Sequence, residues 1–229
     1  MTSFDSTFAY DRDGFAVRDT IQQVHRTSWQ QIANAGSYFT GEQRLEIARQ
    51  ARATRAKRGD PSWLREGLPD AEGRLSEVAV DAARTIAADA HKIDSEWAAK
   101  KIAALGDGAY VELISIVACM SAIDAYSEAL GRAHEPLPDP QPGEPDGGRL
   151  AEATDAGAHV PMIDPFTGPN VARALSLVPS ANQLFFANVM AMYSNGSGGF
   201  YDMEWGGPLD RPQAELIAAR VSAVNECFY

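Results

Sequence analysis

Cysteine and histidine are scarce in this sequence of 229 residues, which contains two cysteines, Cys119 and Cys227, and four histidines. Two thiols are too few for the disulfide framework that holds many small secreted domains together. The histidines are far apart in the sequence, and no Cys/His cluster has the spacing of zinc ligands. The composition therefore predicts neither a disulfide scaffold nor a metal site, and we expect no cofactor.

Positive charge is also in short supply, because 20 Lys and Arg face 31 Asp and Glu, for a net charge of −11. A polyanion would be repelled, so neither nucleic acid nor an anionic membrane is expected as a partner. No stretch approaches the ~20 consecutive apolar residues that span a bilayer. The N-terminal residues are acidic where a secretory signal would be basic and then apolar, so we expect a cytoplasmic protein.

Strand patterns are missing as well, whereas helical patterns are frequent, so the sequence predicts an all-α fold. Hydrophobic residues make up 45% of the chain, enough for a sizeable core. Thr40 is a plausible N-cap for the first expected helix, and Asp210, followed by Pro212, for the last. The ranges expected to be helical are 40–58, 76–92, 95–105, 110–131, 170–177, 180–193 and 211 onward.

Two of these helices stand out by composition. The helix at 110–131 is strongly apolar, and we expect it to be central, with Cys119 as an apolar filler. The helix at 40–58 carries six basic residues. In isolation it looks like a nucleic-acid-binding arm, but the overall negative charge favours a solvated helix face beside acidic neighbours.

A proline- and glycine-rich segment at 132–165 interrupts the helices, because proline and glycine disfavour continuous helix. We expect an extended linker or a strap across a neighbouring surface. The predicted organisation is therefore an N-terminal helical unit at 1–131, the segment 132–165, and a C-terminal unit at 166–229.

The two helical units share a short sequence match. Glu112-Leu113-Ile114 corresponds to Glu215-Leu216-Ile217, an offset of 103 residues. This match suggests two tandem copies of one helical unit. Chance similarity of two amphipathic helices is the alternative.

The C-terminal residues contain the most specific pattern. Glu215 stands twelve positions before Cys227, and the helical run 222–225 precedes the cysteine. This pattern resembles the alkylhydroperoxidase D (AhpD)/carboxymuconolactone decarboxylase superfamily, whose peroxidases carry Glu-x11-Cys-x-x-Cys-x3-His. The segments 38–41, 91–94 and 110–112 also look like that family. The second cysteine and the histidine are not in this sequence, so we expect a fragment that ends inside the motif.

The resemblance implies an AhpD-like helical bundle, two tandem copies of the unit, and an antioxidant peroxidase that reduces hydroperoxides. It implies Glu215 as the proton-relay acid and Cys227 as the first, resolving-type cysteine of the pair. It also implies a homo-oligomer acting on a small-molecule peroxide or lactone. A first-turn acid favoured by the helix dipole is the structural alternative for Glu215.

Helix geometry limits how Glu215 can serve Cys227. In one straight helix these residues would lie ~18 Å apart, at 1.5 Å per residue. We therefore expect a break near Asn225, a good N-cap, with Cys227 in the first turn of a new helix. The unpaired N–H groups there would lower the pKa of a thiol.

A second set of candidate residues consists of His91, Glu112 and Asp124. It is either a general acid/base site, as the decarboxylase branch of the superfamily would need, or a satisfied polar cluster, which we favour. A buried carboxylate needs a partner, so Glu112 should meet a histidine, a hydroxyl or an arginine. A non-catalytic, oligomeric helical module is a third hypothesis for the whole chain.

Overall fold

The structure, a computed structural model, describes residues 8–10, 16–193 and 209–225. By their contacts the residues form two compact units, Met1–Asn188 and Val189–Tyr229. Eight α-helices account for most of the described residues, and the only strands among them are two residues long. The prediction of an all-α fold is confirmed, whereas the AhpD-like arrangement and the tandem copies remain predictions.

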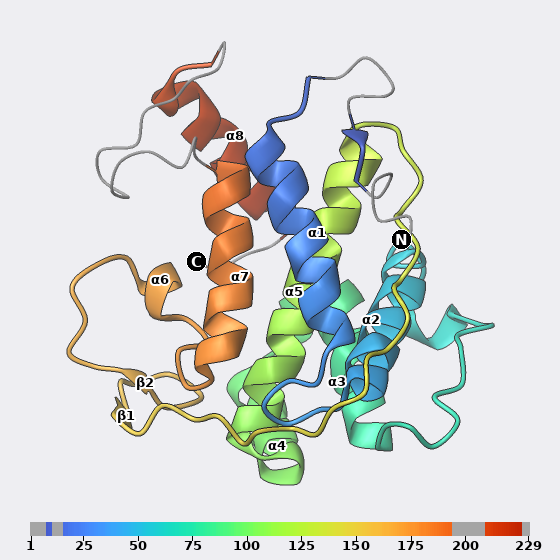
Figure 1. Cartoon of the computed structure of the whole chain (residues 1–229), viewed down its shortest axis with the longest axis vertical. Coiled ribbons are helices and arrows are strands. Elements are labelled where there is room, and N and C mark those ends of the chain that lie inside the picture. The colour runs from blue at the N-terminus through green and yellow to red at the C-terminus, as the bar shows by residue number, and fades with distance from the viewer. Residues whose placement is uncertain (1–7, 11–15, 194–208, 226–229) are drawn as a thin grey trace. The chain divides into compact units, whose positions relative to one another are not determined.

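The first unit is built around α5 (Asp107–Ala129), as the apolar pattern predicted. Figure 1 shows α1 (Asp19–Ala33) crossing this helix, with α2 (Gly41–Arg55) and α3 (Glu77–Ala88) beside it. Side chains such as Leu113, Ile116 and Met120 are fully buried among these helices. Burying each one stabilises the fold by about 1.5–3 kcal/mol.

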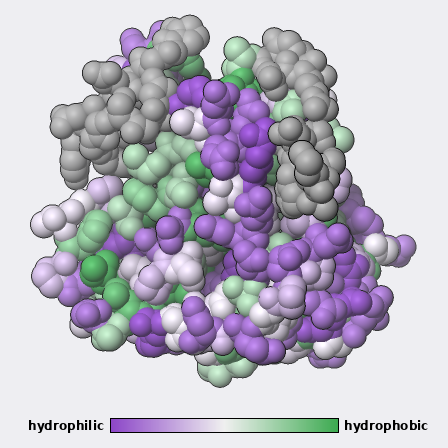
Figure 2. Space-filling model, viewed as in Figure 1, coloured by the Kyte–Doolittle hydropathy of each residue, from purple (hydrophilic) through white to green (hydrophobic). Residues whose placement is uncertain are grey.

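By length and composition α5 could cross a membrane. In the fold, however, 72% of its most apolar stretch is buried inside the protein. Figure 2 shows hydrophilic side chains along α1, which covers α5 in that view. The central helix of a packed bundle is usually apolar and buried in this way, so these properties of α5 are weak evidence for a membrane span.

Side-chain caps fix where several helices begin. The Thr40 hydroxyl accepts a hydrogen bond from the Gln43 N–H at 3.3 Å, and the Gln43 side chain accepts one from the Thr40 N–H at 3.0 Å. This reciprocal capping box starts α2. Asp210 and Gln213 form the same arrangement at the start of α8 (Arg211–Val224), whose first turn contains Pro212. Both predicted caps are confirmed.

Three predicted helices are shorter than expected, and the first of them, at 40–58, is helical only to Arg55. The range 76–92 is helical only to Ala88, and a 3₁₀ turn at Ala90–Lys92 follows it before α4 (Ser95–Leu105). The range 170–177 contains the single turn α6 (Asn170–Arg173).

The segment 132–150 is a strap across the first unit, one of its two predicted forms. Trp29 donates its indole N–H to the Pro136 carbonyl at 2.8 Å. The Gln141 N–H donates to the Ala33 carbonyl at 2.9 Å, and the Gly147 N–H to the Ser37 carbonyl at 2.8 Å. These bonds satisfy backbone groups that helix or sheet would otherwise pair.

After the strap, β1 (Ala153–Thr154) and β2 (Met162–Ile163) form a short antiparallel pair. The chain then enters α7 (Pro179–Tyr193). The Ser115 hydroxyl of α5 donates a hydrogen bond to the Ala181 carbonyl of α7 at 2.8 Å and so joins the two helices. The division between the two units falls after Asn188, within α7, so the whole segment 132–165 belongs to the first unit.

Candidate functional site

Glu215 lies on α8 in the second unit, where two side chains engage its carboxylate. The Tyr193 hydroxyl, at the end of α7, donates a hydrogen bond to Glu215 Oε2 at 2.7 Å. Arg211 Nε is 3.5 Å from Glu215 Oε1, and the Glu215 side chain is 42% exposed. The first turn of α8 contains no acid, because Glu215 is its fifth residue. A first-turn interaction with the helix dipole therefore does not explain this residue.

Tyr193 keeps its proton at neutral pH. Burial, and then its hydrogen bond to Glu215, raise the pKa of the Tyr193 hydroxyl to about 12. The hydroxyl is therefore the donor and the carboxylate the acceptor. A half-exposed carboxylate with a fixed donor on one oxygen can exchange protons with solvent or substrate through its other oxygen.

Cys227 and the expected new helix lie outside the described residues. Up to that point, α8 ends at Val224 and Asn225 is its C-cap, with the Asn225 N–H donating to the Val221 carbonyl at 3.0 Å. Ten residues of this geometry place Asn225 ~15 Å along the helix axis from Glu215.

Glu112 is buried on α5 and has an arginine partner, as predicted for a buried carboxylate. Its Oε1 pairs with Arg44 of α2, and its Oε2 accepts the Tyr38 N–H at 2.6 Å. A side chain at Gly36 would overlap both Glu112 and Arg44, so only glycine fits there. Every part of this carboxylate is thus used within the fold.

Asp124 makes an equivalent pair with Arg52, also of α2, through two hydrogen bonds of 2.7 and 2.8 Å. Asp124 and Glu112 are twelve residues apart on α5, so they lie ~18 Å apart along the helix. His91 is exposed on a 3₁₀ turn. The structure therefore does not bring the three predicted residues together.

The basic face of α2 differs in one respect from its predicted form. The acidic neighbours are present, since Arg44, Arg52 and Arg55 pair with Glu112, Asp124 and Glu128. The predicted solvation is wrong for Arg44, which is 5% exposed. Periodicity located this helix, but it did not show that the arginines point inward toward α5.

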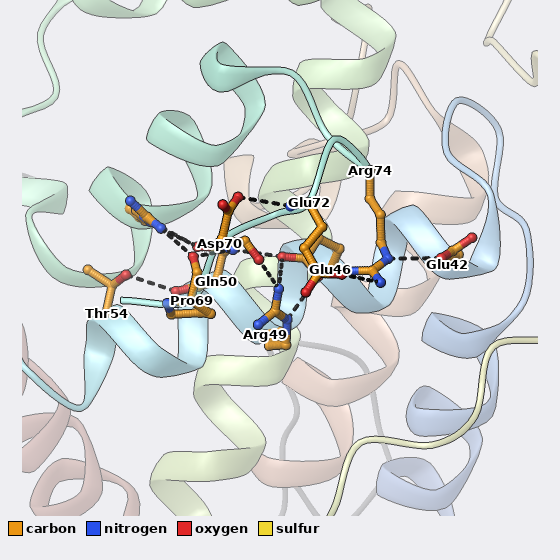
Figure 3. A network of polar contacts seen from close by, with 10 residues as sticks. Glu42, Glu46, Arg49, Gln50, Thr54, Pro69, Asp70, Glu72 and Arg74 are labelled. Carbon is orange, nitrogen blue, oxygen red and sulfur yellow. Dashed lines mark hydrogen bonds and ion pairs between the residues drawn. The ribbon is translucent and has the colours of Figure 1, made fainter. Parts of the chain in front are cut away.

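A second polar network, which the sequence did not indicate, fixes the loop before α3 (Figure 3). Glu46 Oε1 accepts hydrogen bonds from Arg49 and from Gln50, each at 2.7 Å. Gln50 Oε1 accepts two from Arg84, at 2.9 and 2.6 Å. Arg84 also donates to the Pro69 carbonyl at 2.8 Å, which anchors the loop to α3.

The anchored loop forms one wall of a cleft of about 580 Å³ beside α3. Its apolar lining includes Leu68, Leu75 and Val80. The cleft is also lined by the Arg84 guanidinium and by the carboxylates of Asp70, Glu77 and Asp81. Both positively and negatively charged side chains therefore line it.

Cys119 is buried among the side chains of α5 and the core, as the sequence predicted. Burial raises the pKa of its thiol to about 12. A thiolate is the reactive form of cysteine, so Cys119 is chemically inert at neutral pH. Among the described residues no group of three His, Cys, Asp or Glu could hold a metal ion.

Comparison of the chain with protein-family models, with curated proteins and with solved structures found no match.

Proposed function

We propose that this chain is an AhpD-like thiol peroxidase, in which Cys227 and Glu215 belong to the redox centre. The observation that carries the proposal is the hydrogen bond from Tyr193 to Glu215. Glu215 is the glutamate of the Glu-x11-Cys pattern. Its carboxylate contacts Tyr193 and Arg211, whereas a fully solvated surface glutamate would rotate freely. A fixed, half-exposed carboxylate suits proton transfer.

The reaction would begin with a thiolate that attacks one oxygen of a hydroperoxide. The S–O bond forms as the O–O bond breaks, and the other oxygen leaves as an alkoxide that takes up a proton to become an alcohol. The sulfur, oxidised to a sulfenic acid, is then attacked by a second thiol, which releases water and forms a disulfide. A dithiol donor returns the pair to the reduced form.

In the motif that this sequence resembles, the second cysteine carries the attacking thiol, and the first, matched here by Cys227, resolves the sulfenic acid. Glu215 supplies and takes up protons in this scheme, as the proton-relay acid that the resemblance implies. The homo-oligomeric state and the cytoplasmic location are further predictions of the family resemblance and of the composition.

The decarboxylase alternative has less support. It would depend on His91, Glu112 and Asp124, but two of these carboxylates are paired with arginines of α2 and the histidine lies apart on the surface. The non-catalytic module is favoured by one observation. Four large apolar side chains on α8 are exposed, namely Leu216, Ile217, Val221 and Val224, and exposed apolar surface of this kind often binds a partner.

The test is hydroperoxide consumption by the protein expressed from its natural coding sequence, with a dithiol as electron donor. Cys227→Ser should lower turnover, because the disulfide that the donor reduces can no longer form, and Glu215→Gln should lower kcat by about 10²-fold or more, as expected for loss of a general acid/base. Cys119→Ser is the matched control and should leave turnover unchanged. Full turnover by the Cys227→Ser variant would contradict the proposal, and a stable oligomer without any turnover would favour the non-catalytic module.

A further inference from the structure

We infer that Tyr193 is a positioning residue, which orients the Glu215 carboxylate for proton transfer. The inference rests on the proposed function, but it concerns a residue that lies outside the Glu-x11-Cys pattern. Tyr193 is the last residue of α7, whereas Glu215 is in the second turn of α8. The hydrogen bond between them joins the end of α7 to α8 within the second unit.

The two carboxylate oxygens of Glu215 have different surroundings. Within residues 8–10, 16–193 and 209–225, Oε2 accepts the hydrogen bond from Tyr193 at 2.7 Å, while Oε1 has the more distant Arg211, at 3.5 Å. A glutamate side chain with 42% exposure would otherwise sample several rotamers. The tyrosine therefore selects one rotamer and leaves Oε1 as the oxygen that can take up or release a proton.

A hydrogen bond to a charged group is stronger than one between neutral groups. Its removal typically lowers a rate by about 10- to 100-fold when the group acts in catalysis, because it is worth ~1.5–3 kcal/mol and each 1.4 kcal/mol is tenfold. Tyr193→Phe keeps the ring and removes only the donor. We therefore expect kcat to fall by about 10- to 100-fold while KM changes little, since Tyr193 acts through Glu215 and not on the substrate.

A double-mutant cycle separates positioning from a general structural effect. If Tyr193 acts through Glu215, then Tyr193→Phe should cause no further loss of kcat in a protein that already carries Glu215→Gln. If the two substitutions acted independently, the fold losses of kcat in the single variants would instead multiply in the double variant. The matched control is Tyr110→Phe, which removes the hydroxyl of a buried tyrosine that makes no hydrogen bond to the described part of the chain, and it should leave kcat unchanged.

A titration that does not depend on turnover tests the contact itself. With tyrosine labelled at the ring carbon that bears the hydroxyl, NMR should show Tyr193 titrating near pH 12, and Glu215→Gln should shift this titration to lower pH. Wild-type turnover, a loss in Tyr193→Phe and no further loss in the double variant would support the inference. Additive losses, or wild-type activity in Tyr193→Phe, would overturn it. An inactive wild-type protein whose Tyr193 titration still responds to Glu215→Gln would instead overturn the proposed function.

Discussion

Arg52 donates two hydrogen bonds to Asp124, from Nε at 2.8 Å and from a terminal nitrogen at 2.7 Å. This bidentate pair ties α2 to the C-terminal half of α5, and the Asp124 side chain is only 1% exposed. Arg52 also lies over the Trp29 ring of α1, 5.6 Å from its centroid. One guanidinium thus links three helices of the first unit.

Removal of one member of this pair should be costly. Asp124→Ala would leave Arg52 without its counter-ion in a largely buried place, and we expect a loss of about 3 kcal/mol in the free energy of unfolding. Denaturant unfolding measures it. Glu96→Ala is the control, because Glu96 pairs with Lys100 on the surface and should change stability by less than about 0.5 kcal/mol. Equal effects of both changes would mean that the Arg52–Asp124 pair contributes no more than a surface pair.

A methyl group at Gly36 should also destabilise the first unit. Gly36→Ala would overlap Glu112 and Arg44, and neither can move without breaking a buried ion pair. We expect a loss of at least about 2 kcal/mol, typical of overpacking. Gly59→Ala is the matched control, since nothing lies within 4 Å of a methyl group there. A Gly36→Ala protein as stable as Gly59→Ala would show that the loop can open around Glu112.

Acid should weaken the fold through His25. This side chain is fully buried on α1, where its Nδ1 bonds with the Tyr10 hydroxyl at 2.8 Å, and burial lowers its pKa to about 4. The neutral imidazole stabilises the folded state above the unfolded pKa of ~6.5, and this stability is lost as the pH falls from there toward 4. We expect a loss of about 2 kcal/mol between pH 7 and pH 5.

The histidine effect can be isolated by chemical unfolding at several pH values. His25→Phe should remove the pH dependence in this window, whatever its effect on stability at pH 7. Asp89 and Glu128, whose arginine partners Arg65 and Arg55 lower their pKa to about 2, act only at lower pH. An unchanged slope between pH 7 and pH 5 in His25→Phe would assign the effect to another group.

Thiol chemistry should be blocked at Cys119. Because its pKa is about 12, the Cys119 thiol is far less ionised at pH 8 than a free thiol of pKa ~8.5. We therefore expect Cys119 to be alkylated roughly 10³-fold more slowly than a free thiol. Mass spectrometry of the peptide that contains Cys119 should show labelling by iodoacetamide only after unfolding in urea. Rapid labelling in the native protein would mean that α5 is not the closed core helix described above.

The sequence predicted those parts of the fold that depend on local signals. The cap at Thr40 and the apolar pattern of α5 were read correctly, because side-chain capping and continuous burial act within one segment. Helix α1 was not predicted. Its inward face includes Gln22, His25 and Ser28, so its buried residues do not form an apolar stripe.

The polar contacts were predicted only in kind. A carboxylate inside an apolar helix implied a partner for Glu112, but the sequence could not tell which of the six basic residues of 40–58 would face it. The strap, too, depends on contacts between residues far apart, such as Trp29 with Pro136. Tertiary packing decides these pairings, and it leaves no periodic trace in the sequence.

The most direct test of the redox proposal is the oxidation state of Cys227 after one equivalent of hydroperoxide, measured by mass spectrometry on the protein from its natural coding sequence. We predict that Cys227 is recovered in a disulfide that dithiothreitol reverses, while Cys119 stays a free thiol. Recovery of Cys227 as a free thiol, in the same yield as Cys119, would contradict the account.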